Sequence, residues 1–180
     1  HDIQIWILGD IVDSGKCGDN LTWTLDEDGL LEISGTGEMY DYKRFESPFY
    51  GPDMQTGVHE IKIKEGVTSI GSNVFCWLTS LKKISIPNSV LRIGDSAITT
   101  CSMTSLEIPD SVVEIGEGAF SGNSNLEKVV LSKNITTISD DMFCNCQKLT
   151  DIEIPDGVRE IGLGVFGECS NLKELKIPDT

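Results

Sequence analysis

The sequence has few of the residues that acid–base catalysis, zinc binding and nucleic-acid binding need. Its 180 residues include two histidines, His1 and His59, which leaves little material for acid–base or zinc chemistry. Only 14 lysines and arginines stand against 29 acidic residues, and the formal net charge of -15 repels phosphate backbones and anionic membranes. The longest apolar stretch, around Ile3 to Leu8, is much too short to cross a bilayer. We therefore expect no nucleic-acid partner and no membrane insertion.

The motifs of common enzyme classes are also missing. No G-x-S-x-G motif accompanies His59. The segment Gly35-Thr36-Gly37 lacks the third glycine of a dinucleotide-binding loop. Acidic residues recur at solvent positions of the repeat described below, which favours a hydrated surface over the carboxylate pair of a glycosidase. We predict that the chain is not an enzyme and that it uses no cofactor.

The second two-thirds of the chain contain a repeat of about 23 residues. Seven slots of the repeat are apolar in all five complete units, although only 39% of the chain is hydrophobic, and this regularity does not arise by chance. No unit can bury seven apolar side chains alone, so the units must stack around a continuous core. The units are spaced by 23, 22, 23, 23 and 23 residues and start at Val58, Leu81, Met103, Leu126, Leu149 and Leu172.

Each unit is expected to contribute one short strand. Alternation in segments such as ISI (84–86) puts one face inward, and successive copies should pair in parallel about 4.8 Å apart. Helix should be limited to a turn or two around the small-or-apolar plus aromatic pair, such as Ala119-Phe120. Prolines that end the strand ladder follow at Pro87, Pro109, Pro155 and Pro178. Glycines that predict a turn with positive φ follow at Gly71, Gly94, Gly116 and Gly162, while Ser139 departs from this rule.

The unit L-x-x-I-x-I-P-x-x-V-x-x-I-G-x-x-A-F-x-x-C resembles the BspA-like class of bacterial leucine-rich repeats. The segment Cys17–Tyr42 also resembles the N-terminal module that often precedes those repeats in surface proteins. This resemblance implies a leucine-rich repeat solenoid that is rich in β-strands and poor in helix. It also implies a secreted or cell-surface bacterial protein that adheres to host cells or matrix. Repeat scaffolds carry many unrelated binding surfaces, so the resemblance specifies the fold more closely than the function.

Residues 1–57 are predicted to form a capping module, and residues 58–180 the solenoid. Leu21, Trp23 and Leu25 alternate before a turn at residues 26–29, and Leu31 and Ile33 alternate after it, which predicts a β-hairpin. This module holds 12 acidic and 3 basic residues, so the acidity is concentrated at this end of the chain. Aromatic residues suited to cover the first apolar layer, or alternatively to stack on a sugar or peptide, are Tyr40, Tyr42, Phe45, Phe49 and Tyr50.

Three of the six cysteines share one slot of the repeat. Cys101, Cys146 and Cys169 occupy it, and Asn123 fills it in the third unit. A slot that accepts either residue indicates a buried donor that satisfies backbone carbonyls of the neighbouring turn. Cys144-x-Cys146 alone is a weak zinc motif, so we predict a row of thiols and no metal site.

The outward positions of the predicted sheet are the natural binding surface of such a solenoid. Acidic and basic side chains are mixed there and no aromatic platform is present, which favours a polar protein–protein contact over a stacked sugar. A face that is only solvated is the alternative. The predicted protein-binding residues are Glu60, Lys62, Lys83, Ser85, Ser105, Glu107, Lys128, Val130, Asp151, Glu153, Glu174 and Lys176.

We therefore predict a non-enzymatic, secreted or cell-surface repeat protein that binds host or other extracellular proteins. One alternative is a structural spacer or self-assembly module that associates through its last repeat edge at residues 172–177. Another is a carbohydrate-binding module. The chain begins with HDIQIW and stops partway through a sixth unit, which favours a piece of a longer protein; the other interpretation is a whole chain whose last edge is covered by a partner.

Overall fold

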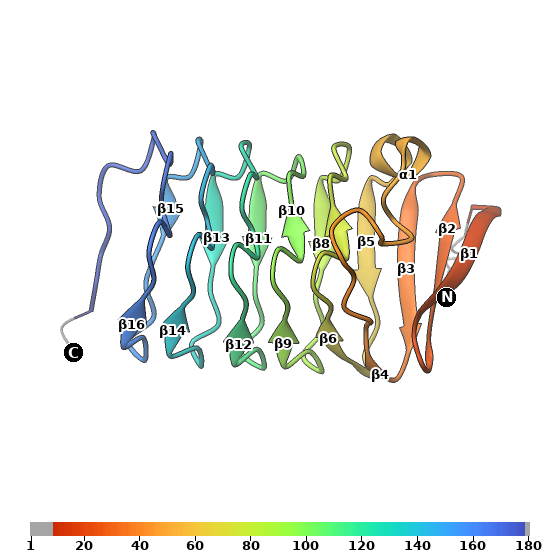
Figure 1. Cartoon of the computed structure of the whole chain (residues 1–180), viewed down its shortest axis with the longest axis horizontal. Coiled ribbons are helices and arrows are strands. Elements are labelled where there is room, and N and C mark those ends of the chain that lie inside the picture. The colour runs from red at the N-terminus through yellow and green to blue at the C-terminus, as the bar shows by residue number, and fades with distance from the viewer. Residues whose placement is uncertain (1–8, 179–180) are drawn as a thin grey trace, which may run out of the picture.

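The computed structural model describes residues 9–178 and shows a β-solenoid with an antiparallel sheet at its N-terminal end (Figure 1). Successive turns of the chain stack along the long axis, so that β1 lies at one end and β16 near the other (Figure 1). This arrangement confirms the predicted solenoid with little helix. His1 and the apolar stretch from Ile3 to Leu8 lie outside the described residues.

The N-terminal sheet begins with three antiparallel strands, β1 (Ile11–Gly18), β2 (Leu21–Asp26) and β3 (Leu30–Gly35). Strands β2 and β3 form the predicted hairpin, in which Leu25 faces Leu31 across the ladder. Asp26 shapes the turn, because its Oδ1 accepts hydrogen bonds from the backbone N–H groups of Asp28 (3.1 Å) and Leu30 (2.8 Å). Strand β1 was not anticipated because its mostly exposed residues lack an apolar alternation.

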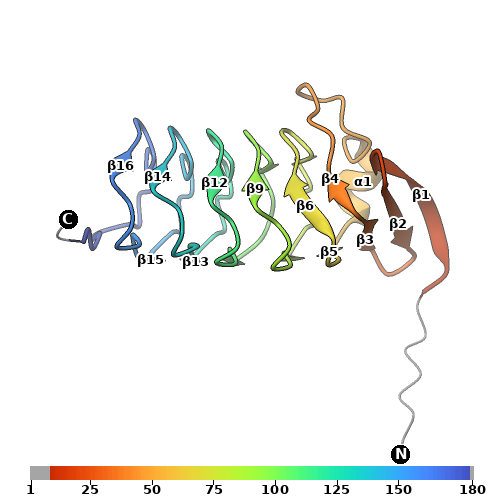
Figure 2. The same ribbon diagram turned by 90° about the horizontal axis from the view of Figure 1, so that it is seen from below.

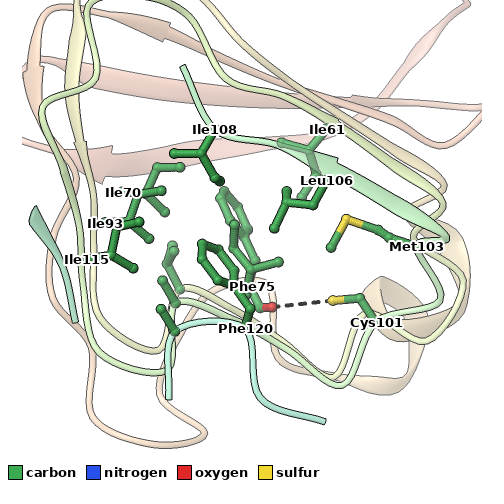
Figure 3. Close-up of a cluster of buried hydrophobic side chains, with 14 of the residues drawn as sticks. Ile61, Ile70, Phe75, Ile93, Cys101, Met103, Leu106, Ile108, Ile115 and Phe120 are labelled. Carbon is green, nitrogen blue, oxygen red and sulfur yellow. Dashed lines mark hydrogen bonds between the residues drawn. The ribbon is translucent and has the colours of Figure 1, made fainter. Parts of the chain in front are cut away.

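The solenoid has three sides, which are seen end-on in Figure 3. The first side continues from β3, which pairs in parallel with β5. It contains β5 (Glu60–Ile63), β8 (Lys83–Ser85), β11 (Ser105–Glu107), β13 (Lys128–Val130) and β15 (Asp151–Ile152). The second side contains β4 (Gly37–Glu38), β6 (Val67–Ile70), β9 (Arg92–Ile93), β12 (Glu114–Ile115), β14 (Thr137–Ile138) and β16 (Glu160–Ile161). The third side contains β7 (Phe75–Cys76) and β10 (Ile98–Thr99).

The core lies between these three sides (Figure 3). Ile70, Ile93 and Ile115 stack on one another from the second side, while Phe75 and Phe120 enter from the third (Figure 3). All five side chains are at most 3% exposed. Each turn therefore buries its apolar side chains against the turns before and after it, as the repeat pattern predicts.

The prediction of positive φ at the repeated glycine is wrong. Gly71, Gly94, Gly116 and Gly162 are all missing from the residues with positive φ in the described chain. The glycine is needed because the preceding turn approaches closely. A Cβ on Gly116 would lie 2.6 Å from the backbone nitrogen of Asp95, and a Cβ on Gly162 would lie 2.6 Å from that of Asp140. Glycine provides room for stacking here, rather than conformational freedom.

The expected helical turn at the aromatic slot is also wrong. The helix α1 (Pro52–Gly57) lies before the first repeat, and the aromatic slots form turns and the short strands β7 and β10. The backbone N–H of Phe75 donates to Ala97 O (2.8 Å), and that of Phe120 donates to Met142 O (3.0 Å). These donors bond the next turn of the solenoid, so they are not used for hydrogen bonds within a helix.

The sheet on the first side is interrupted between β8 and β11. Strands β5 and β8 pair in parallel, as do β11, β13 and β15, but within residues 9–178 no ladder joins β8 to β11. The gap follows the one repeat of 22 residues, whose final loop is a residue shorter, and Ser102 N donates instead to Leu81 O (3.0 Å). Ile84 and Ile86 are consequently half-buried, whereas Ile61 in the preceding repeat is fully buried.

Native-state hydrogen exchange tests this interruption. In the next repeat Lys128 N donates to Thr104 O (3.2 Å), whereas the matching amides of β11, those of Ser105 and Glu107, face the gap. We expect these two amides to exchange about 10-fold faster than those of Lys128 and Val130, because they lack a cross-strand partner. Insertion of one Asn between residues 102 and 103 should restore their protection. Equal protection of both pairs in the unmodified chain would contradict the interruption.

Candidate functional site

The candidate site is the outward surface of the first side, which we call the first-side face. Because side chains alternate along a strand, Ile61, Leu106 and Val129 point into the core, and the residues on either side of each one point outward. The structure leaves all twelve predicted residues accessible: Glu60 and Ser85 are half-buried and the other ten are exposed. Strands β5 to β15 carry most of them, and a parallel bridge between Glu153 and Lys176 continues the row into the sixth repeat.

Opposite charges on the first-side face pair across neighbouring repeats. The closest pairs join Lys83 Nζ to Glu60 Oε1 (2.7 Å) and Lys128 Nζ to Asp151 Oδ2 (2.8 Å). The strand register places these residues directly opposite one another. The hydrogen bond from Lys128 to Asp151 raises the pKa of the Lys128 amine, which therefore stays charged. Exposed ion pairs contribute little to stability, so their main effect here is a fixed pattern of charge.

Two hollows open on the first-side face. The hollow between β13 and β15 has a volume of about 540 Å³, and the hollow at the gap between β8 and β11 has about 480 Å³. Both contain apolar and charged groups, so a partner could place side chains in them. Eight predicted residues line the two hollows: Lys128, Val130, Asp151 and Glu153 in the first, and Lys83, Ser85, Ser105 and Glu107 in the second.

The slot shared by cysteine and asparagine is a row of buried donors, as predicted. Each donor reaches the backbone carbonyl at the aromatic slot of the preceding repeat, and Figure 3 shows the bond made by Cys101. Burial raises the pKa values of the Cys101 and Cys146 thiols to about 12, which keeps them neutral donors. The row comprises Cys101 Sγ to Phe75 O (3.7 Å), Asn123 Nδ2 to Ile98 O (2.8 Å), Cys146 Sγ to Phe120 O (3.4 Å) and Cys169 Sγ to Phe143 O (3.1 Å).

All six cysteines are free thiols. Across residues 9–178, no group of three or more histidine, cysteine, aspartate or glutamate side chains is placed to hold a metal ion. The same part of the chain contains no helix with the length and hydrophobicity needed to span a membrane.

The N-terminal aromatic residues divide into a buried and an exposed group. Phe49 is fully buried and packs against Trp23 (5.3 Å between ring centroids) and Phe75 (5.2 Å), so it covers the first apolar layer. Phe45 and Tyr50 remain 46% and 39% exposed.

Three exposed hydrophobic residues escaped the reasoning from sequence. Leu91 and Val113 lie side by side on the second side, 51% and 56% exposed, and Trp77 is 39% exposed on the third. The repeat pattern gives no signal for them, because Thr136 and Arg159 occupy the slot of Leu91 in later units.

The last repeat edge exposes apolar side chains as well. Leu163 is 81% exposed, Ile177 60% and Ile161 41%. Self-association through this edge stays a prediction.

Comparisons with known proteins agree with this architecture. A family model described as a BspA type leucine rich repeat region, with 6 copies, matches residues 53–173. No curated protein matches the chain. Among solved structures, a leucine-rich repeat protein from Bacteroides ovatus has a TM-score of 0.61 and 24% identity, covering 91% of this chain and 53% of that one. The chain therefore spans about half the length of that protein.

Two further solved structures share the fold. The leucine-rich repeat protein of T. pallidum has a TM-score of 0.54 and 20% identity, covering 88% of this chain and 91% of that one. The pneumococcal vaccine antigen PcpA has a TM-score of 0.57 and 18% identity, covering 94% of this chain and 49% of that one. These likenesses show the fold alone. The repeat of about 23 residues, its stacking into a solenoid and the match over residues 53–173 together show that this chain belongs to the BspA-type leucine-rich repeat family of bacterial proteins.

Proposed function

We propose that the chain is a non-enzymatic scaffold of the bacterial surface, or of a secreted protein, whose first-side face binds a host or other extracellular protein. The observation that carries the proposal is the exposed row of charges on that face, held in a fixed order by pairs such as Glu60–Lys83 and Asp151–Lys128. Membership of the leucine-rich repeat family supports it, since such solenoids generally present extended binding surfaces.

The chemistry of the first-side face fits a protein partner better than a small ligand. Alternating charges at repeat spacing can be matched by charges of opposite order on another protein, which gives specificity and faster association. Val130, which is 45% exposed, lines the larger hollow and supplies an apolar contact among the charges. Protein interfaces commonly combine such an apolar centre with a polar rim.

Charge-swap variants test this proposal. Glu60→Lys with Lys83→Glu inverts one pair, and Lys128→Asp with Asp151→Lys inverts another, while net charge and the opportunity for pairing are preserved. Surface plasmon resonance against purified extracellular-matrix and serum proteins should give a partner whose Kd rises about 10-fold in either variant, because two attractive contacts become repulsive.

The matched control changes charges on the second side. Glu114→Lys with Arg159→Glu also preserves net charge, and both residues are exposed outside the first-side face. Its affinity should stay within about 2-fold of the unmodified chain. Binding that neither swap weakens, or no binding to any protein of the panel, would contradict the proposed face.

A further inference from the structure

A separate hollow lies on the third side of the solenoid. The segment between β4 and α1 projects from the stack of turns (Figure 2) and brings Arg44 to this side. The hollow has a volume of about 240 Å³, room for a single small ring. We call it the Trp77 hollow, and its lining residues are Arg44, Asn73, Cys76, Trp77, Ser96, Thr99, Thr100 and Ser121.

The charge of the Trp77 hollow differs from that of its surroundings. Arg44 is its one charged lining residue, whereas four other hollows of the described chain are each lined by at least one carboxylate. The Arg44 guanidinium lies 4.7 Å from the centre of the Phe45 ring, which packs against Tyr50 at 4.8 Å between centroids. Within the described chain, Arg44 forms no ion pair with a carboxylate. The Trp77 hollow therefore carries a positive charge, although the chain as a whole has a net charge of -15.

Trp77 occupies a position that is unfavourable for its residue type. Its φ is 66°, and the same slot has positive φ in the other repeats, where it holds Thr100, Gly122, Asn145 and Glu168. Glycine and asparagine tolerate this conformation, whereas a bulky residue there is strained. The indole is nevertheless 39% exposed, so burial in the core does not explain its presence. A strained and exposed aromatic ring beside a hollow indicates a ligand-binding role.

Hydroxyl groups line the remainder of the Trp77 hollow. The side-chain hydroxyls of Ser96, Thr100 and Ser121 make no hydrogen bond with other residues of the described chain, whereas the Thr99 side chain is hydrogen-bonded to the Cys76 thiol. Hydroxyls elsewhere in the repeats are used structurally, as when Ser102 Oγ donates to Thr79 O (2.6 Å). The three free hydroxyls belong to two successive repeats and supply donors and acceptors to the hollow.

We propose that the Trp77 hollow binds a pyranose ring that carries a carboxylate, as in the terminal residue of an acidic glycan. The indole of Trp77 would cover the apolar C–H face of the ring, the free hydroxyls would bond its hydroxyls, and Arg44 would pair with its carboxylate. A polyhydroxylated ring uses all three features, whereas an acidic peptide side chain would leave most of the hydroxyls without a partner. This site is separate from the first-side face and does not depend on the function proposed for it.

Titration with simple glycosides tests the proposal. Chemical shifts of the tryptophan indole N–H groups report binding of methyl β-D-glucuronide, methyl β-D-glucoside and N-acetylaspartate amide to the intact chain. We expect saturable binding of the glucuronide, with the other two compounds bound about 10-fold more weakly. Arg44→Gln and Trp77→Asn should each weaken glucuronide binding about 10-fold, while Trp77→Phe, which retains a ring, should stay within about 3-fold.

Controls separate the site from general effects. Lys43→Gln removes a neighbouring cation that does not line the hollow and should leave binding unchanged. Asparagine suits positive φ at residue 145, so Trp77→Asn should fold, and circular dichroism verifies this. No saturation by about 50 mM glucuronide overturns the site. If the glucoside binds as tightly as the glucuronide, the proposed contact between Arg44 and the carboxylate is wrong. If N-acetylaspartate amide binds as tightly, the preference for a sugar ring is wrong. If Arg44→Gln and Trp77→Asn leave glucuronide binding unchanged, the ligand binds elsewhere.

Discussion

The substitution Asn123→Ala is expected to lower the free energy of unfolding by about 3 kcal/mol. The Asn123 side chain is fully buried, and its Nδ2 donates to Ile98 O (2.8 Å) and Phe120 O (2.7 Å). Its Oδ1 accepts a hydrogen bond from Cys101 N (2.9 Å). Truncation removes these partners at once and leaves backbone groups of two neighbouring turns buried without a hydrogen bond. Urea denaturation followed by circular dichroism measures the loss.

The matched variant is Asn123→Cys. Cysteine fills the same slot at Cys146, where its thiol reaches the carbonyl of the preceding repeat at 3.4 Å. Asn123→Cys should therefore cost about 1 kcal/mol, because it keeps one donor and loses the acceptor for Cys101 N. If the alanine and cysteine variants are equally stable, hydrogen bonding at this slot does not hold the turns together.

The second large effect is expected at a glycine. Gly116→Ala should destabilise the fold by about 3 kcal/mol, because the added Cβ would lie 2.6 Å from the backbone nitrogen of Asp95. The added Cβ would also clash with the Asp95 Oδ1, which cannot easily move away because it accepts a hydrogen bond from Glu117 N (2.9 Å). Thermal and urea denaturation of the variant measure this cost. Its origin is steric, since Gly116 is outside the set of residues with positive φ.

The fourth repeat supplies the control. Ser139 occupies the glycine slot there, its Oγ donates to Ile115 O (2.6 Å), and the preceding turn carries Glu117 in place of an aspartate. Ser139→Gly should therefore change stability by no more than about 1 kcal/mol. In a double-mutant cycle, Asp95→Ala should relieve part of the cost of Gly116→Ala, with a coupling of about 1 kcal/mol. Strictly additive effects would contradict the steric explanation.

The periodic features of the fold could be predicted because every repeat presents them again. The Ile70, Ile93 and Ile115 stack follows from one slot repeated at 22 or 23 residues. The role of Asn123 also follows, because asparagine and cysteine share only a few properties, among them the ability to donate a hydrogen bond. The role of Gly116 does not follow in the same way. Both a positive φ and a close approach of the neighbouring turn require glycine. Only the position of that turn in the structure shows which of the two reasons applies.

Features that depend on one repeat were beyond prediction. The spacing of 22 residues was visible in the sequence, but the gap between β8 and β11 depends on which loop is short and how the chain closes it. On the first-side face, alternation predicts which residues face outward, and the partner of Lys83 follows once Glu60 is known to lie one repeat away. The Trp77 hollow depends on Arg44, which comes from a segment outside the repeat and has no periodic signal.

The gap between β8 and β11 has a consequence for the mechanical behaviour of the chain. The ladders that join neighbouring turns run along the long axis, so a pull on the two ends loads them one after another. Within residues 9–178, the first side contributes no ladder between the second and third repeats, and the second side contributes none between the third and fourth, because β12 and β14 do not pair. The load falls on the pairing of β9 with β12 at the first of these junctions and on the pairing of β11 with β13 at the second. Under shear flow, these two junctions are where the solenoid would begin to extend.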